Sequence, residues 1–457
     1  MGRIRCGLVA ALAAPRWMLA PALFGVLVLS GCTWAGAGGG TGEGTVTVAI
    51  VANPQMRDIQ KLTGEFEREH PDVKVRYVTL PENEARARIT QDVATKAGQF
   101  DVVMIGTYEA PIWGRNDWLT DLDKYTRTDR EYDVDDLMPA VRKGLSADGK
   151  LYAVPFYGES SFLMYRKDLF EQAGLTMPDR PTWTQVAEFA RRLKTPDRAG
   201  ICLRGLPGWG EQLAPLDTVI NTFGGRWYDE DWNAQLTAPA TARAVKFYID
   251  LVKQAGEPGA PNAGFSECLT AYTQGQAAMW YDATVAAGSL EDAKVSKVVG
   301  KNGYAPAPVM ETDWSGWLWA WSLAIPKTAK DPDAAWKFIS WATSKEYIRM
   351  VGERLGWERV PPGSRLSTYE IPEFVEASAG SAEVTLDALR TVDPNRATKE
   401  PVPYTGIQYV QIPEFQDLGT RVSQQFAAVL AGNQSVEDAL ETAQSEAEAV
   451  AEDGYKD

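Results

Sequence analysis

Patterns typical of strands and patterns typical of helices alternate along residues 45–106. The strand patterns are the valine-rich segments TVTVAIV, VKVRYVTL and FDVVMIG. Between them, apolar residues recur at the three- and four-residue spacing of an amphipathic helix, as at Met56, Ile59 and Leu62. Such alternation predicts an α/β fold with parallel strands at the start of the chain.

The ends of these predicted strands are candidate binding positions, because ligands of parallel α/β sheets bind beyond the carboxyl ends of the strands. Asn53 follows the first strand, and Tyr108 and Glu109 follow the third. We therefore expect these three side chains to lie at a common edge of the sheet.

The length and charge of the chain limit its organisation and its partners. At 457 residues, the chain is long enough for two or three lobes. Its formal net charge is -15 at pH 7. This acidic balance argues against nucleic acid or an anionic membrane surface as a partner.

Histidine is nearly absent from the sequence, which disfavours several classes of enzyme. The one histidine, His70, lies in a polar segment before a predicted strand. A catalytic triad needs a histidine as its base, and many zinc sites need one as a ligand. The sequence also contains no phosphate-binding glycine loop and no CxxC pair. We therefore predict no catalytic residue, no metal and no cofactor.

The first 31 residues resemble a bacterial lipoprotein signal peptide. Basic residues are followed by an apolar run that ends in LSGC at Cys32. Cys32 would then be the lipidated first residue of the mature chain, followed by a glycine-rich tether over residues 32–43. A retained membrane anchor is the alternative. The lipoprotein interpretation predicts a protein outside the cytoplasm that contacts the membrane through lipid only.

Two cysteines, Cys202 and Cys268, follow the predicted signal and tether. Because export implies an oxidising compartment, this even pair predicts a disulfide. Free thiols in the core are the alternative.

Residues 315–326, SGWLWAWSLAIP, place tryptophan at every second position. In a strand, alternate side chains point to the same face, so Trp317, Trp319 and Trp321 would share one face. They are either core or one wall of a binding site that stacks against a ligand.

Four segments, 100–125, 162–193, 272–283 and 333–348, resemble successive signatures of the family 1 extracellular solute-binding proteins. This family provides the receptors of sugar-importing ABC transporters. Segments 315–326, 356–365 and 402–416 are most similar to its sorbitol- and mannitol-binding branch.

The resemblance implies a type II periplasmic-binding-protein-like fold with two α/β lobes joined by a hinge. The first lobe would comprise residues 44–154 and 309–345, and the second residues 155–308 and 346–457. Hinge crossings are expected in AVPFYGE and YAPAPV, near Pro155 and Pro308.

The resemblance also implies a ligand site between the lobes. A polyol or sugar needs carboxylates and amides for its hydroxyl groups and indoles for its C–H faces. Arg204 occupies a position where the family has an acidic residue. The candidate binding residues are Asn53, Tyr108, Glu109, Glu159, Ser160, Arg204, Trp209, Asp282, Trp317 and Trp319.

The resemblance predicts a monomeric, lipid-anchored binding protein that delivers a polyol or sugar to the transmembrane subunits of an ABC permease. One alternative is a secreted glycoside hydrolase that uses Glu109 and Glu159 as its two carboxylates. Another is a lipid-anchored adhesin, which would explain the anchor but not paired lobes.

Overall fold

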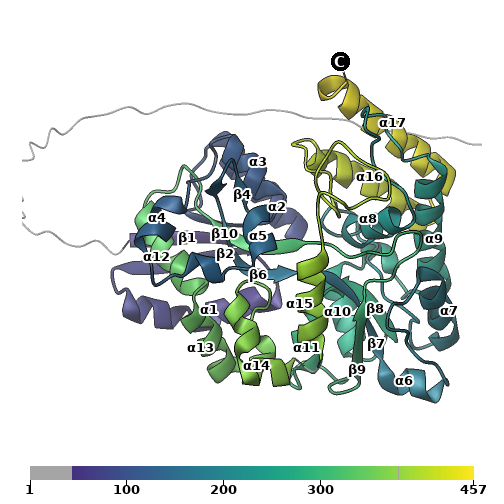
Figure 1. Ribbon diagram of the computed structural model, residues 1–457, viewed down its shortest axis with the longest axis horizontal. Coiled ribbons are helices and arrows are strands. Elements are labelled where there is room, and N and C mark those ends of the chain that lie inside the picture. Colours follow the sequence, from purple (N-terminus) through teal and green to yellow (C-terminus); the bar gives the residue numbers. More distant parts are fainter. Residues whose placement is uncertain (1–43, 379, 457) are drawn as a thin grey trace, which may run out of the picture. The chain divides into compact units, whose positions relative to one another are not determined.

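The structure, a computed structural model, describes residues 44–378 and 380–456 (Figure 1). The predicted signal peptide, the tether and Cys32 lie outside these residues. Within them, no helix has the length and apolar character needed to cross a membrane.

The first lobe is built on a five-stranded sheet in the order β2-β1-β3-β10-β6. Strands β1 and β2 are parallel, as are β1 and β3, which confirms the parallel α/β start of the chain. Strand β10 returns from much later in the sequence and runs antiparallel to both β3 and β6. The five strands are β1 (Gly44–Val51), β2 (Val73–Leu80), β3 (Val102–Ile105), β6 (Val154–Glu159) and β10 (Trp319–Ala324).

Helix α1 shows how the sequence positions the elements of this lobe. The side chain of Asn53 accepts a hydrogen bond from Met56 N at 2.9 Å and caps the helix. Met56, Ile59 and Phe66 are buried on the apolar face that the sequence predicts. The other elements of this lobe are α2 (Glu82–Thr95), α3 (Glu109–Arg115), α4 (Asp123–Thr128), η1 (Val134–Asp136), α5 (Pro139–Gly144), β4 (Ser146–Ala147), β5 (Lys150–Leu151) and α12 (Pro332–Ala342), with α1 spanning Pro54–Glu69.

The second lobe is built on a three-stranded antiparallel sheet in the order β8-β7-β9. Its strands are β7 (Ser161–Arg166), β8 (Met279–Ala283) and β9 (Asn302–Pro306). A capping box formed by Thr182 and Gln185 begins α7. The helices of this part are α6 (Lys167–Gln172), α7 (Trp183–Leu193), α8 (Leu213–Thr222), α9 (Pro239–Ala255), η2 (Ala260–Asn262), α10 (Phe265–Thr273), α11 (Ala286–Glu291), α15 (Ser381–Thr391), α16 (Phe415–Leu430) and α17 (Val436–Gly454).

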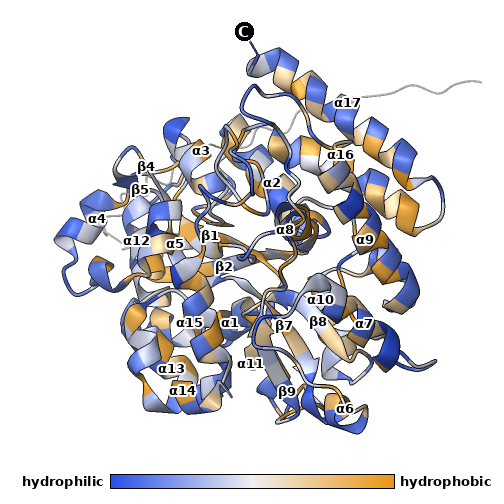
Figure 2. Ribbon diagram, turned by 45° about the vertical axis from the view of Figure 1, so that its right-hand side comes forward, coloured by the Kyte–Doolittle hydropathy of each residue, from blue (hydrophilic) through white to orange (hydrophobic). Residues whose placement is uncertain are grey.

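Helix α17 lies along α16 near the carboxyl end of the chain (Figures 1 and 2). Hydrophobic and hydrophilic residues alternate along its length in Figure 2, and its small apolar residues Ala443, Ala447 and Ala451 are buried. The C-terminal segment therefore completes the second lobe.

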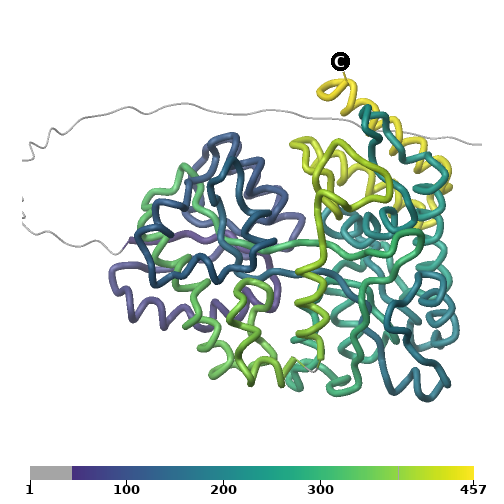
Figure 3. The backbone as a smooth tube through the Cα atoms, viewed as in Figure 1, coloured from purple at the N-terminus to yellow at the C-terminus, as the bar shows by residue number. Residues whose placement is uncertain are grey.

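The chain passes between the two sheets at two strand ends (Figure 3). Only Ser160 separates β6 of the first sheet from β7 of the second, and residues 307–318 connect β9 with β10. The sequence predicts hinge crossings near Pro155 and Pro308, in the same stretches of the chain, whereas β6 keeps residues 154–159 in the first sheet.

The contacts of the helices between residues 345 and 377 indicate to which lobe this part of the chain belongs. They are α13 (Lys345–Leu355), η3 (Trp357–Arg359), η4 (Leu366–Glu370) and α14 (Pro372–Ala377). Helix α13 contacts α12, and α14 contacts η3 and η4, whereas α15 contacts β7 and β9. These contacts favour a first lobe that extends beyond residue 345, and the predicted lobe boundaries stay a prediction.

The tryptophan-rich segment forms a shorter strand than the sequence predicts. Gly316 has a φ of 106°, in the left-handed region that favours glycine, and β10 begins only at Trp319. Trp317 therefore lies before the strand, while Trp319 and Trp321 lie in it. All three indoles are buried.

Cys202 and Cys268, the pair that the sequence predicts, are joined by a disulfide in the structure. Cys202 forms an isolated bridge with Trp280 of β8, and Cys268 lies on α10. The bond fastens α10 to the second sheet.

Candidate ligand-binding cleft

A cavity of about 300 Å³ lies where the ends of the two sheets meet. Residues after β1 and β2 line one side, β6 and the tryptophan segment line the base, and residues of the second lobe line the other side. The lining residues include Asn53, Glu82, Arg86, Tyr157, Glu159, Arg204, Trp209, Glu211, Phe265, Trp317, Trp319, Trp321 and Gln408.

The structure brings six of the ten predicted binding residues to this cavity. They are Asn53, Glu159, Arg204, Trp209, Trp317 and Trp319. The other four, Tyr108, Glu109, Ser160 and Asp282, do not line the cavity but support residues that do or lie in the hinge.

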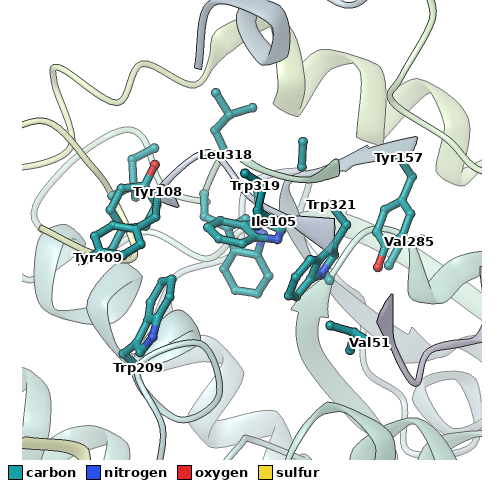
Figure 4. Packing of buried hydrophobic residues seen from close by; sticks show 14 of the residues in the cluster. Val51, Ile105, Tyr108, Tyr157, Trp209, Val285, Leu318, Trp319, Trp321 and Tyr409 are labelled. Atoms are coloured by element: carbon teal, nitrogen blue, oxygen red, sulfur yellow. The ribbon is translucent and has the colours of Figure 1, made fainter. Parts of the chain in front are cut away.

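Aromatic rings form one wall of the cavity (Figure 4). Ring centroids are 5.9 Å apart for Trp209 and Trp319, and 5.5 Å apart for Trp319 and Trp321. Trp319 can occupy this place because residue 106 is glycine: a Cβ there would lie 2.0 Å from the indole. The tryptophans of residues 315–326, which the sequence assigns either to the core or to a binding wall, are therefore both buried and part of the wall.

Arg86 lies against this aromatic wall. Its guanidinium carbon is 4.1 Å from the ring centroid of Trp209 and 4.6 Å from that of Trp321, distances typical of cation–π contacts. Arg86 Nε donates to Glu82 Oε1 at 3.0 Å, and Nη1 donates to Glu109 Oε1 at 2.6 Å. Glu109 also accepts from Gly106 N at 2.9 Å. Glu109 therefore positions Arg86.

Arg204 is held in a similar way in the second lobe. It donates to both carboxylate oxygens of Asp282, at 2.8 and 2.5 Å, and to Gly210 O at 2.9 Å. Asp282 also accepts from Trp280 Nε1 at 3.0 Å. Burial alone would lower the pKa of Arg204, but the neighbouring carboxylates of Asp282 and Glu211 raise it above its ordinary value. Asp282 therefore fixes the direction of the guanidinium group that lines the cavity.

Tyr108 and Ser160 have structural positions next to the cleft. Tyr108 Oη donates to Ile412 O at 2.9 Å, and its ring centroid is 4.8 Å from that of Trp209. Ser160 lies between β6 and β7, where its N donates to Thr284 Oγ1 at 3.3 Å.

Three lining atoms or groups have no hydrogen-bond partner among residues 44–378 and 380–456. Gln408 Oε1 and Trp317 Nε1 are buried without a partner. The Glu159 carboxylate makes no hydrogen bond within the same residues, and Glu159 is only 6% exposed. Burial raises the pKa of Glu159 to about 8, and the nearby Arg204 partly opposes this increase. Burial also raises the pKa of Glu211.

The sequence analysis missed several lining residues. Glu82 and Arg86 follow β2, so they lie beyond the carboxyl end of a predicted strand, as Asn53 and Tyr108 do, and could have been selected for the same reason. Phe265 lies at the start of α10, the helix that also carries Cys268 of the disulfide. Gln408 comes from an irregular C-terminal segment, and its local sequence contains no signal for a cleft position.

The geometry does not fit the predicted glycosidase alternative. A glycosidase needs two carboxyl groups that flank one scissile bond. Glu159 lines the cavity, but Glu109 is only 2% exposed and is engaged by Arg86. The two carboxylates therefore do not face a shared substrate.

Comparison with known proteins agrees with this architecture. The family model of the bacterial extracellular solute-binding proteins matches residues 53–348. The chain is 48% identical to a mannitol-binding protein of Pseudomonas aeruginosa over 406 residues, which cover 88% of this chain and 92% of the relative.

Two solved structures show the same fold. An ABC transporter solute-binding protein of Agrobacterium vitis with bound D-mannitol is 50% identical, with a TM-score of 0.88 over 90% of this chain and 99% of that one. A solute-binding protein of Agrobacterium radiobacter in complex with ribitol is 26% identical, with a TM-score of 0.79 over 89% and 98% of the two chains. Two lobes around a polar and aromatic cavity, together with the match of the family model to most of the chain, show that this protein belongs to the bacterial extracellular solute-binding proteins.

Proposed function

We propose that this protein binds a polyol in the cleft and delivers it to the membrane subunits of an ABC importer. The observation that carries the proposal is the set of unpartnered polar groups in the cavity. Gln408 Oε1 and the Glu159 carboxylate offer acceptors, and Trp317 Nε1 offers a donor. Each hydroxyl of a polyol can both donate and accept, which suits a site whose residues offer acceptors and a donor together.

The aromatic wall supports the same ligand class. Trp209, Trp319 and Trp321 give flat apolar surface for the C–H groups of a carbon chain. The mannitol and ribitol named for the related proteins are polyols, which supports this class without selecting one stereoisomer.

Calorimetry tests the proposal directly. The purified chain should bind at least one of D-mannitol, D-sorbitol, ribitol and xylitol with one-to-one stoichiometry. Glu159→Ala should weaken that binding about five- to a hundred-fold, because it leaves a ligand hydroxyl buried without its partner, at a cost of about 1–3 kcal/mol. Glu131→Ala, at an exposed position of the first lobe, is the matched control. If none of these polyols binds, the proposed ligand class is wrong.

We also propose that Cys32 carries lipid and attaches a monomer to the outer side of the cell membrane. The LSGC sequence and the glycine-rich residues after it support this proposal. Cells that express Cys32→Ala should not label the protein with a fatty-acid probe. Labelling of the variant at the wild-type level would contradict the lipoprotein interpretation.

A further inference from the structure

More acidic than basic side chains line the cavity. Four carboxylates line the cavity, whereas only Arg86 and Arg204 contribute guanidinium groups. Each guanidinium group is also held by a carboxylate that does not line the cavity, Glu109 for Arg86 and Asp282 for Arg204. The four lining carboxylates belong to Glu82, Glu159, Glu211 and Glu267.

Glu159 is the carboxylate that this arrangement leaves without a cation of its own. Glu82 and Glu211 lie within 3.4 Å of an arginine nitrogen, and Glu267 is exposed and accepts from Gly264 N. No ion pair of Glu159 occurs within residues 44–378 and 380–456. The charged or titratable groups that act on Glu159 are Arg204, Asp282, Glu82, Arg86 and Tyr157.

A buried carboxylate without a partner favours its protonated form, and a cation beside it favours the ionised form. The rings of Trp319 and Trp321 already face the guanidinium group of Arg86, so the attraction for an added cation comes from Glu159. Gln408 Oε1 offers a further acceptor but no charge. The cavity is therefore better suited to an added positive charge than to an added negative charge.

We propose that the cleft also takes a cationic ligand: a polyol in which one terminal hydroxyl is replaced by a primary ammonium group, with that ammonium on Glu159. The proposal rests on the proposed polyol site, whose hydroxyl contacts would hold the rest of the chain. The same geometry excludes the corresponding acid, in which that end of the chain is a carboxylate.

Three ligands with one carbon skeleton test this proposal. D-Sorbitol is neutral, 1-amino-1-deoxysorbitol is a cation, and gluconate is an anion, and the corresponding mannitol series provides a second set. We expect the amine to bind at least as tightly as the neutral polyol and the acid at least about a hundred-fold more weakly, a difference of about 2.7 kcal/mol. Equal binding of acid and amine would overturn the proposal.

The number of protons released when the amine binds shows whether its ammonium group contacts Glu159 or remains in solvent. The pKa of Glu159, raised by burial to about 8, means that its carboxyl is mostly protonated at pH 7 in the absence of ligand. Calorimetry in two buffers of different ionisation enthalpy should therefore show release of about one proton on binding the amine and almost none on binding the neutral polyol. Equal proton release for the two ligands would contradict the contact.

Glu159→Gln separates charge from hydrogen bonding. This variant should weaken binding of the amine at least about ten times more than binding of the neutral polyol, since only the charge is lost. Glu131→Gln makes the same charge change at an exposed position and should leave the ratio unchanged. If Glu159→Gln does not fold, proton release by the wild-type chain still decides the matter. Binding of polyols without the amine overturns this inference alone, whereas binding of no polyol overturns the proposed function as well.

Discussion

At the scale of single residues, the cleft depends on two buried arginines. Arg86 lies between Glu82 and Glu109, and Arg204 lies between Glu211 and Asp282. In each case one carboxylate lines the cavity and the other does not. Paired charges of this kind can be buried because both partners are hydrogen bonded, and removal of one partner leaves the other without compensation.

Arg204→Met should destabilise the protein by about 3–5 kcal/mol, because it leaves the Asp282 carboxylate buried with only neutral donors. Urea unfolding of the variant and the wild type measures the difference. Arg57→Met, at an exposed position of α1, should change stability little. The double variant Arg204→Met, Asp282→Leu should recover most of the loss. A single variant as stable as the wild type would show that the pair is not needed.

Glu257 predicts a pH dependence of stability. Its side chain is largely buried without a hydrogen-bond partner among the described residues, and burial raises its pKa from 4.5 to about 7. The folded state therefore binds a proton more tightly than the unfolded state. The resulting contribution to stability is complete below pH 4.5 and is lost as the pH rises to about 7.

Glu257→Gln removes this ionisation. Its free energy of unfolding relative to the wild type should rise between pH 4.5 and about 7 by up to about 3 kcal/mol. Urea titrations at several pH values measure this difference, with Glu131→Gln as the exposed control. A difference that stays constant with pH would mean that Glu257 ionises normally.

At the scale of elements, α10 connects the disulfide with the cleft. Cys268 and Phe265 lie on the same helix, and Phe265 N donates to Glu211 Oε2 at 3.1 Å. The disulfide joins residues 66 positions apart, and Cys268 follows Phe265, Ser266 and Glu267, the residues of α10 that line the cavity. The position of this helix therefore depends on a covalent bond as well as on packing.

Replacing Cys202 and Cys268 by alanine should reduce the free energy of unfolding by about 4 kcal/mol, because the unfolded chain regains the freedom of a long loop. Polyol affinity should fall as well, since Phe265 and Glu211 lose a fixed position. Urea unfolding and calorimetry of the double variant measure both effects, and reduction of the wild type should reproduce them. Unchanged stability in both cases would contradict this role of the disulfide.

At the scale of the whole described chain, contacts cross from one lobe to the other around the cleft. Asn83 Nδ2 donates to Pro207 O at 3.0 Å, and Arg86 lies against Trp209. Tyr108 of the first lobe donates to Ile412 O. These contacts enclose the cavity. The chain passes between the lobes at Ser160, at residues 307–318 and again between α14, which ends at Ala377, and α15, which begins at Ser381, so a rotation of the lobes would bend the chain at these connections.

Ligand binding should therefore close the two lobes by a hinge motion. Small-angle scattering should show a smaller radius of gyration with saturating polyol than without it. Trp209→Ala should reduce this change, because it removes the surface in the second lobe on which Arg86 rests. Identical scattering of the free and bound wild type would contradict a large closure.

The sequence by itself determined the α/β class, the amphipathic helices and the cysteine pair, because these depend on local periodicity and on a few residue types. The end of β1, where Asn53 lies, could be recognised as a binding position for the same reason, whereas Tyr108 and Glu109 after β3 were selected in the same way but do not line the cavity. The resemblance to a known family supplied the two lobes and the region of the cleft.

Only the tertiary structure decided which side chains line the cavity and which support them. Glu109 and Asp282 look like binding residues in the sequence, yet each is engaged by an arginine that faces the cavity in its place. Gln408 comes from a segment 90 residues away from Leu318, whose carbonyl oxygen holds its amide group. Such contacts join residues distant in the sequence, so they depend on how the sheets and the C-terminal segment pack, which no local pattern encodes.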